Sequence, residues 1–125
     1  MPAHVLIVED SALVVGALRL LLEESGFRVT AAPGVQAALR AVRADPPDAM
    51  LLDLSLKDGS GLDVLGALTA AEAPGVTIAV TGHDDAATRE RCLRAGCREV
   101  LVKPIDASSL PRRLRAWIGE RAESS

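Results

Sequence analysis

Short apolar runs alternate with longer amphipathic segments along the whole chain, and this alternation constrains the fold more than any other feature. Five runs have the length and residue types of β-strands: His4–Val8, Arg28–Ala32, Ala49–Asp53, Thr77–Thr81 and Glu99–Val102. Most of them are apolar on both faces, and such strands need helices above and below a parallel sheet. The pattern therefore predicts an α/β fold built as a three-layer sandwich.

The segments between these strands carry apolar residues at helical spacing. We expect five helices, over Ser11–Glu24, Val35–Ala44, Gly61–Ala71, Asp84–Ala95 and Asp106–Arg121. Asp84 or Asp85 suits the N-cap of the fourth helix, and Pro111 is tolerated only in the first turn of the fifth. The segment Leu54–Ser60 is expected to be a loop.

The chain has 125 residues, a length typical of one domain, which we assign to residues 1–125. No apolar stretch approaches the ~20 residues of a membrane span, and Glu9 and Asp10 interrupt the early apolar run that a signal peptide would need. Cys92 and Cys97 fit neither a zinc-site spacing nor a redox-pair spacing. We therefore expect reduced cysteines, a cytoplasmic location and no contact with a membrane.

Basic residues concentrate in the last third of the chain. Residues 86–121 contain nine Lys or Arg and four Asp or Glu, whereas residues 1–85 contain five and twelve. Such an asymmetry marks an interaction surface in some proteins, and the solvated faces of ordinary helices explain it equally well. The net charge of -3 and the scarcity of aromatic residues argue against direct binding of nucleic acid.

Polar side chains follow four of the five expected strands. Glu9 and Asp10 follow the first strand, Asp53 ends the third, Thr81 ends the fourth and Lys103 follows the fifth. The carboxyl ends of parallel strands meet at one edge of the sheet, where α/β proteins bind their ligands. We expect these side chains to gather there, although each alone has an ordinary explanation, such as the capping of the first helix by Glu9 and Asp10.

This set of residue types points to phosphoryl transfer. Three carboxylates packed together repel one another unless a cation neutralises them, and Mg²⁺ prefers oxygen ligands of this kind. A carboxylate beside that ion can attack phosphorus and form an acyl phosphate. Asp53 is the best candidate for the nucleophile because it ends the most central apolar strand. The Lys103 ammonium and the Thr81 hydroxyl would then stabilise the phosphoryl oxygens.

On its motifs the sequence resembles a response-regulator receiver domain of two-component signal transduction. The motifs are His4–Asp10, Pro47–Asp53, Asp58–Gly61, Val80–Gly82, Ala95–Gly96 and Val102–Ile105, in that order. The resemblance implies a flavodoxin-like, five-stranded parallel sheet in the order 2-1-3-4-5 with five helices. It also implies a phosphorelay in which Asp53 receives the phosphoryl group from a phosphohistidine on a histidine kinase or a histidine phosphotransfer protein. Such a module is not an enzyme, since it catalyses only its own phosphorylation and dephosphorylation.

Further residue roles follow from the same resemblance. Mg²⁺ would be held by Asp10, Asp53, the main-chain carbonyl of Ser55 and, through water, Glu9. Ser55 and His83 would flank the path of the attacking water and so tune the lifetime of the aspartyl phosphate. An exposed residue at the start of a helix is an equally good interpretation of His83.

The expected switch departs from the family pattern. In the family, phosphate draws the Thr toward it, and an aromatic residue three positions before the Lys turns inward. These positions are Thr81 and Val100 here, and the chain contains no Tyr. Lys57 also stands where the family usually has Pro, so the loop after Asp53 is expected to be more mobile. Phosphorylation should survive because Thr81 and Lys103 are present, but a phosphorylation-independent scaffold is the alternative that Val100 favours.

The surface that such a switch controls is formed by the fourth helix, the fifth strand and the fifth helix. We expect partner binding, or a homodimer, through this surface. Because the sequence ends after its last helix, the resemblance fits either a stand-alone receiver or one from a larger protein such as a hybrid histidine kinase.

Two other classes of protein fit the sequence less well. A phosphatase of the haloacid-dehalogenase type needs a second Asp two residues after its nucleophile, and that position is Ser55. A dinucleotide-binding protein needs a Gly-rich loop after its first strand, and Glu9–Asp10 stands there instead. Neither class therefore replaces the phosphoacceptor hypothesis.

Overall fold

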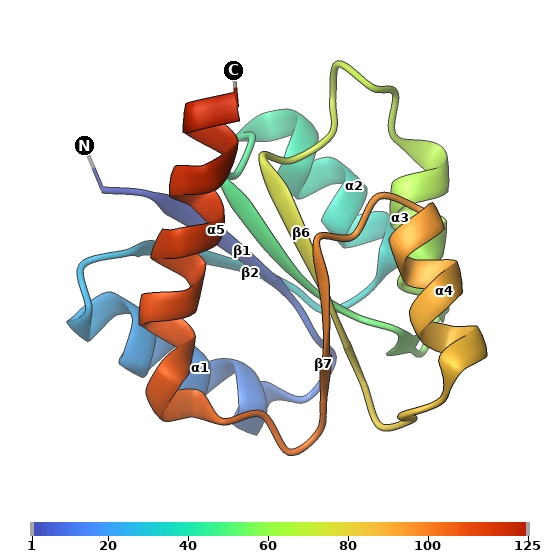
Figure 1. The fold of residues 1–125 in the computed structure, drawn as a ribbon, viewed down its shortest axis with the longest axis horizontal. Helices are drawn as coiled ribbons and strands as arrows, with labels where there is room; N and C mark the ends of the chain where they lie inside the picture. Colours follow the sequence, from blue (N-terminus) through green and yellow to red (C-terminus); the bar gives the residue numbers. More distant parts are fainter. Residues whose placement is uncertain (1, 125) are drawn as a thin grey trace.

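The computed structural model describes residues 2–124 and has a five-stranded parallel sheet at its centre (Figure 1). The strands are β1 His4–Val8, β2 Arg28–Ala32, β3 Ala49–Asp53, β6 Val76–Thr81 and β7 Glu99–Val102. They lie in the order β2-β1-β3-β6-β7, and each pairing between neighbours is parallel. Counted along these five strands the order is 2-1-3-4-5, so the predicted flavodoxin-like topology is confirmed.

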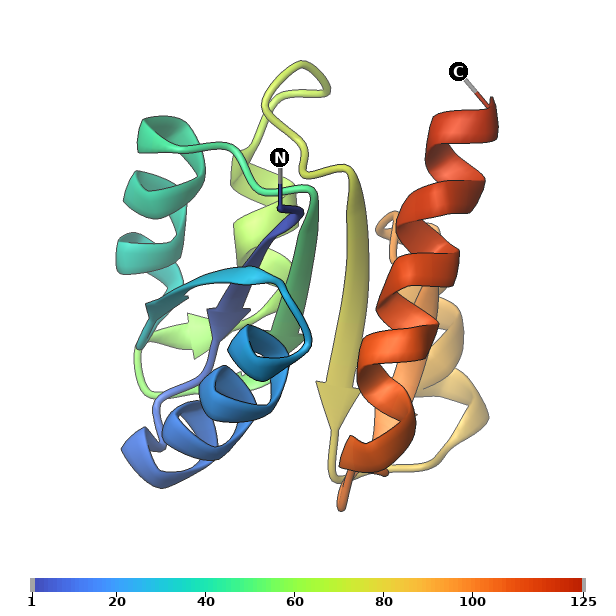
Figure 2. The same ribbon diagram turned by 90° about the vertical axis from the view of Figure 1, so that its left-hand side faces the viewer.

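Helices cover both faces of the sheet and complete the predicted three-layer sandwich. One face carries α1 Ala12–Glu24 and α5 Leu110–Ser124, and the other carries α2 Val35–Ala44, α3 Leu62–Ala67 and α4 Ala86–Arg94. Figure 2 shows the long α5 beside β6, on the side of the sheet away from α2 and α3. Each face of the sheet therefore has its own hydrophobic core.

Side chains of the central strands alternate between these two cores. On β1, Val5 and Ile7 pack with residues of α1 and α5, whereas Leu6 and Val8 pack with residues of α2 and α3. All four side chains are almost fully buried. This double burial explains why the strands read as continuous apolar runs rather than as alternating ones.

The strand register brings the carboxyl ends of the central strands to one level. Val8 of β1 lies opposite Leu52 of β3, and the next residue of β3, Asp53, lies opposite Val80 of β6. Thr81 in turn lies opposite Val102 of β7. Residues that end or follow these strands are therefore neighbours in space, although they are far apart in the chain.

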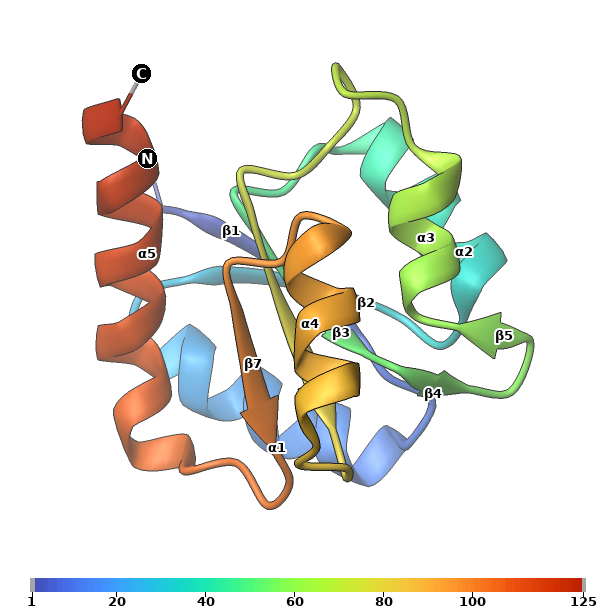
Figure 3. The same cartoon turned by 45° about the vertical axis from the view of Figure 1, so that its right-hand side comes forward.

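The segment after β3 is more ordered than the predicted loop over Leu54–Ser60. It contains a small antiparallel hairpin, β4 Ser55–Leu56 and β5 Gly59–Ser60, which Figure 3 shows at the edge of the molecule next to α3. Gly59 has a φ of 152°, a value that residues with a side chain rarely adopt. The turn residues in this segment therefore close a short hairpin, so the prediction of a loop over the whole of Leu54–Ser60 was wrong.

The third helix is shorter than the predicted Gly61–Ala71, because α3 ends at Ala67. Leu68 already has an extended backbone, with φ -85° and ψ 141°. Just beyond it, Thr69 N donates to Glu72 Oε1 at 2.9 Å and Glu72 N donates to Thr69 Oγ1 at 3.2 Å. These two hydrogen bonds have the reciprocal pattern of a capping box, and they stabilise a separate turn directly after the extended Leu68.

The other boundaries shift by a few residues. Ser11 is the N-cap of α1 rather than its first helical residue, and Asp85, one of the two N-cap candidates predicted for α4, is confirmed in that role. Each side chain accepts a hydrogen bond from a first-turn N–H. A 3₁₀ turn over Ala107–Ser109 precedes α5, so Pro111 lies in its first turn, where a missing N–H is not needed. No helix within residues 2–124 combines the length and apolar character that crossing a membrane requires.

Candidate functional site at the carboxyl edge of the sheet

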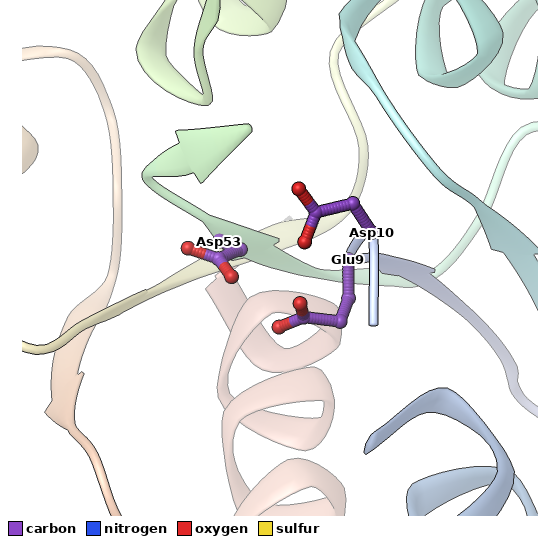
Figure 4. Close-up of side chains that lie close together, drawn as sticks. All are labelled: Glu9, Asp10 and Asp53. Carbon is purple, nitrogen blue, oxygen red and sulfur yellow. The ribbon is translucent and has the colours of Figure 1, made fainter. Parts of the chain in front are cut away.

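Three carboxylates converge where β1 and β3 end. Glu9 and Asp10 follow β1, Asp53 ends β3, and one oxygen from each lies within 4.8 Å of the other two. Figure 4 shows the three side chains around a common space. Glu9 and Asp53 are buried and Asp10 is half-buried, so the cluster is partly shielded from water. The predicted gathering of these residues is thus present in the fold.

Lys103 brings the positive charge of the site. Its Nζ lies 2.8 Å from Asp53 Oδ2 and 3.6 Å from Glu9 Oε2, although it comes 50 residues after Asp53 in the chain. The backbone N–H of Lys103 donates to the carbonyl of Thr81 at 2.8 Å, which continues the β6–β7 ladder up to this residue. The strand pairing therefore aims the ammonium at the acidic cluster.

The pKa values of the Glu9 and Asp53 carboxylates shift in opposite directions from their ordinary values. Burial is the main reason that the pKa of Glu9 is raised to about 6, and the neighbouring Asp53 carboxylate adds to it. Burial acts on Asp53 as well, but hydrogen bonds with Glu9, Lys103 and Ser55 outweigh it and lower the pKa of Asp53. Glu9 therefore takes up a proton first, and Asp53 is ionised at neutral pH.

The backbone around Asp53 is held by two close contacts. Ser55 N donates to Asp53 Oδ1 at 2.8 Å, which fixes the second carboxylate oxygen. A Cβ on Gly61 would lie 2.2 Å from the carbonyl oxygen of Asp53, so the chain can pass there only as glycine. Gly61 N also donates to the carbonyl of Leu54 at 3.1 Å. The hairpin thus returns directly onto the residue that ends β3.

Thr81 and His83 lie one strand away from Asp53. Thr81 is buried at the end of β6, and its Oγ1 accepts a hydrogen bond from His83 N at 3.1 Å. His83 itself is exposed in the segment before α4. The structure thus brings Thr81 to the same edge of the sheet as the acidic cluster, with its hydroxyl tied to the following loop.

The residues 5–115 match the family model described as the response regulator receiver domain. This chain belongs to that family. The acidic cluster with its Lys is the feature of the fold that fits the family's phosphoryl-accepting aspartate, and a receiver is a signalling module of two-component systems rather than a true enzyme.

Curated relatives of this receiver are two-component response regulators. The chain is 37% identical over 115 residues to the transcriptional regulatory protein KdpE of Mycobacterium tuberculosis, covering 91% of this chain and 50% of that protein. It is 34% identical over 118 residues to the acid tolerance regulatory protein ActR of Rhizobium meliloti, covering 94% and 61%. The receiver therefore spans only about half to three-fifths of these relatives.

Solved structures agree on the fold. A CheY-like receiver from Methanospirillum hungatei superposes with a TM-score of 0.92 at 22% identity, over the full length of both chains. The receiver domain of the sensor histidine kinase PA1611 from Pseudomonas aeruginosa is 30% identical, with a TM-score of 0.80 over 95% of this chain and 99% of that one. That PA1611 structure has a magnesium ion coordinated in its active-site cleft.

The receiver also contains a link that sequence reasoning missed. Asp58, in the turn of the hairpin, accepts hydrogen bonds from Val35 N at 2.8 Å and Gln36 N at 3.3 Å. These two N–H groups lower the pKa of Asp58. They belong to the first turn of α2, where backbone N–H groups have no partner within the helix. The N-cap residue of α2 is Gly34, which has no side chain to serve them, and a Cβ there would lie 2.6 Å from Asp58 Oδ1. The glycine before α2 was the sequence signal for this contact, because a helix without a capping side chain of its own needs an acceptor from elsewhere in the chain.

Val100, the position of the expected switch aromatic, is a core residue of the receiver. It is buried on β7 and packs with Ala79, Cys92 and Cys97 beneath α4. Both cysteines are free thiols, and burial raises the pKa of Cys97 to about 12. The core below α4 thus consists of aliphatic side chains and two thiols, with Leu54, Leu62 and Leu65 packed against it.

The arginines of the basic third are mostly engaged within the receiver. Three of them form ion pairs: the half-buried pair of Arg89 with Glu99 at 3.1 Å, and the exposed pairs of Arg94 with Glu90 at 2.5 Å and of Arg98 with Glu120 at 2.8 Å. Arg113 and Arg115 lie over the rings of Trp117 and Phe27, with 5.0 Å and 4.4 Å to the centroids. These five arginines therefore have contacts within the receiver, as charged residues on the solvated faces of ordinary helices do.

Proposed function

We propose that residues 1–125 form one cytoplasmic receiver that accepts a phosphoryl group on Asp53 from a phosphohistidine of a histidine kinase or a histidine phosphotransfer protein. One observation carries this proposal: a buried, ionised Asp53 is fixed between Lys103 Nζ and Ser55 N, both at 2.8 Å. A carboxylate held in this way is oriented for attack and stays deprotonated at neutral pH.

The donor set of the site fits Mg²⁺. Two oxygens bound to one Mg²⁺ at about 2.1 Å each lie roughly 3 to 4 Å apart. The carboxylate oxygens of Glu9, Asp10 and Asp53 lie within 4.8 Å of one another, close to this spacing. The family resemblance assigns direct binding to Asp10 and Asp53 and binding through water to Glu9. The carbonyl of Ser55 would complete the set. When bound, Mg²⁺ would neutralise charge on the phosphoryl oxygens and on the carboxylates.

Each residue of the site has a defined part in the transfer. An oxygen of the Asp53 carboxylate attacks phosphorus, the bond from phosphorus to the histidine nitrogen breaks, and the imidazole leaves. Lys103, already paired with Asp53, is close enough to bind a phosphoryl oxygen as charge develops. The Thr81 hydroxyl would turn to donate a hydrogen bond to another phosphoryl oxygen while its oxygen still accepts the bond from His83 N.

Thr81, Val100 and the surface of α4, β7 and α5 form the proposed output. A movement of Thr81 would pull on the segment that leads into α4, because His83 N is bonded to its hydroxyl. Ser55 and His83, which border Asp53 and Thr81, would set how long the aspartyl phosphate survives. Partner binding or homodimerisation would then respond at α4, β7 and α5.

A phosphorylation-independent scaffold is the second candidate function. The observation that favours it is Val100, a buried aliphatic residue where the family has an aromatic that turns inward. In this alternative, a partner would bind equally well whether or not Asp53 is modified. Binding of a cognate partner measured with and without phosphorylation separates the two candidates.

Intact-mass spectrometry after treatment with acetyl phosphate and Mg²⁺ tests the proposal. We expect the wild-type chain to gain the mass of one phosphoryl group and Asp53→Asn to gain none. Asp84→Asn, an exposed carboxylate ahead of α4, is the matched control and should be labelled like the wild type. An unlabelled wild type, or an Asp53→Asn variant labelled to the same extent, would contradict the proposal.

A further inference from the structure

A cavity of about 520 Å³ opens beside the acidic cluster, between α1 and the segment that follows β7. Val14, Ala17 and Leu18 of α1 form one wall, and Ile105 and Ala107 form the wall opposite. Buried side chains of β1, β3 and β6 make the floor. These apolar walls have no part in the phosphoryl chemistry described above.

The cavity has the anatomy of a small-molecule site. Its volume lies within the roughly 300 to 1,000 Å³ of pockets that hold small ligands, which are mostly apolar with a few polar groups at defined places. The charged groups on its lining, Glu9, Asp53 and Lys103, all belong to the carboxyl edge of the sheet. A molecule that fills it must therefore be apolar along its body and polar at one end.

The charged residues at the polar end of the cavity determine which polar group a bound molecule should carry. Glu9, Asp10 and Asp53 supply three carboxylates, and Lys103 supplies one ammonium that is already paired with Asp53. A second cation is complementary to this balance, whereas an anion would meet the carboxylates unshielded. Of the two carboxylate oxygens that pair with Lys103 Nζ, Glu9 Oε2 is the farther, at 3.6 Å against 2.8 Å for Asp53 Oδ2.

We propose that this cavity binds a small amphipathic ammonium ion, with its apolar body between Val14, Ala17 and Ile105 and its ammonium group at Glu9. This goes beyond phosphoryl acceptance, and the binding itself does not depend on it. One consequence does rest on the proposed function: the ammonium and Mg²⁺ would use the same carboxylates, so each would weaken the binding of the other. A bound amine would thereby oppose phosphorylation of Asp53.

Tryptamine is a suitable probe, with 3-ethylindole and indole-3-propionate as neutral and anionic counterparts of similar size. We would titrate each into the isotope-labelled chain without Mg²⁺ and follow the backbone amide resonances. Tryptamine should give saturable shifts at Val14, Ala17, Leu18 and Ile105, with an affinity at least tenfold above that of either counterpart. Mg²⁺ at ten times its own dissociation constant should weaken tryptamine binding roughly tenfold.

Ala17→Leu supplies the matched variant. The larger side chain would enter the cavity, on a helix that favours Leu, and should lower tryptamine affinity at least tenfold. Ala12→Leu, at an exposed position of the same helix outside the cavity, should leave the affinity unchanged. Folding of both variants is checked by their thermal unfolding midpoints.

Several results would overturn the inference. These are the absence of saturable shifts, equal binding of the neutral or anionic probe, full affinity in Ala17→Leu, or, in a chain shown to bind Mg²⁺, tryptamine binding that Mg²⁺ does not affect. Shifts of the same resonances with protein concentration alone would show that a second copy of the chain occupies the cavity, which would also overturn it. Labelling by acetyl phosphate in the absence of tryptamine tests the proposed function separately, so the two can fail independently.

Discussion

The carboxyl edge of the sheet and the α4–β7–α5 face are both rich in charge, but they arrange it in opposite ways. At the edge, three carboxylates meet one Lys, and Glu9 and Asp53 are buried. On the face, Arg89, Arg94 and Arg98 each pair with a Glu, and these pairs are half-buried or exposed. The edge thus concentrates its charge in a buried cluster that a ligand can neutralise, whereas the charges of these three arginines are each met by a Glu near the surface.

This contrast indicates where charge interactions are strong in this receiver. Buried charges interact strongly because water screens them little, and exposed pairs contribute about 0 to 1 kcal/mol. Phosphoryl transfer needs strong charge interactions, so we expect it at the edge, where charges are concentrated and shielded from water. Signal output at α4, β7 and α5 is therefore expected to depend on movement of the backbone and of apolar side chains more than on net positive charge.

Lys103→Ala tests the edge most severely. Removing a single preorganised donor to a developing charge typically costs about 10²- to 10³-fold in rate, and we expect that loss in the initial rate of phosphorylation by acetyl phosphate. Lys57→Ala, an exposed Lys in the hairpin turn, should change the rate little. If Lys57→Ala lowered the phosphorylation rate as much as Lys103→Ala, the position of Lys103 at the edge would not explain its effect.

Asp58→Ala tests whether the edge depends on the hairpin that carries Ser55. Asp58 holds this hairpin to the start of α2, so its loss should let Ser55 move and should lower Mg²⁺ affinity roughly tenfold, as for other supports of metal ligands. Asp85→Ala removes the comparable cap of α4 and serves as the control, with Mg²⁺ affinity unchanged. Metal titrations monitored by Trp117 fluorescence or calorimetry would measure both, and a matching loss in Asp85→Ala would refute the link.

Glu9 makes the edge sensitive to pH in the absence of Mg²⁺. Its pKa in the folded chain, about 6, is above the ordinary 4.5, so the native state binds a proton more readily than the unfolded state. The stability from this group is complete below pH 4.5 and is lost as the pH rises through about 6. Chemical denaturation across pH 4.5 to 7 should show this fall, and Glu9→Gln should abolish it. A parallel fall in Glu9→Gln would assign the effect to another group.

Arg98→Ala probes the face, where we expect the smallest effect. Arg98 and Glu120 are about half exposed, so breaking their ion pair should change the free energy of unfolding by less than about 1 kcal/mol. Phosphorylation of Asp53 should continue at the wild-type rate. Urea denaturation and acetyl phosphate labelling measure the two quantities, and a large change in either would mean that charge on the face matters more than its exposure suggests.

Sequence reasoning succeeded where local patterns coincide with the topology. Apolar runs predicted all five strands of the main sheet, because double burial leaves a continuous signal in the sequence. The polar residues that end those runs then had to share one edge, which anticipated the proximity of Asp53, Glu9, Asp10 and Lys103.

The features that were missed depend on contacts between distant segments. No local pattern says that Asp58 serves the N–H groups of Val35 and Gln36, or that a Thr69–Glu72 turn ends α3 early. The pairing of Arg98 with Glu120 likewise needs β7 and α5 to be placed first. Such contacts follow from the assembled fold and were not encoded in periodicity or spacing.

The site of phosphorylation is the most direct test of the account. Borohydride reduction of the chain after treatment with acetyl phosphate and Mg²⁺ converts an aspartyl phosphate to homoserine, which peptide sequencing by mass spectrometry locates. Homoserine is expected at position 53 alone, where the Asp53 carboxylate contacts Lys103. Homoserine at another acidic residue, or none in a chain that has bound Mg²⁺, would contradict it.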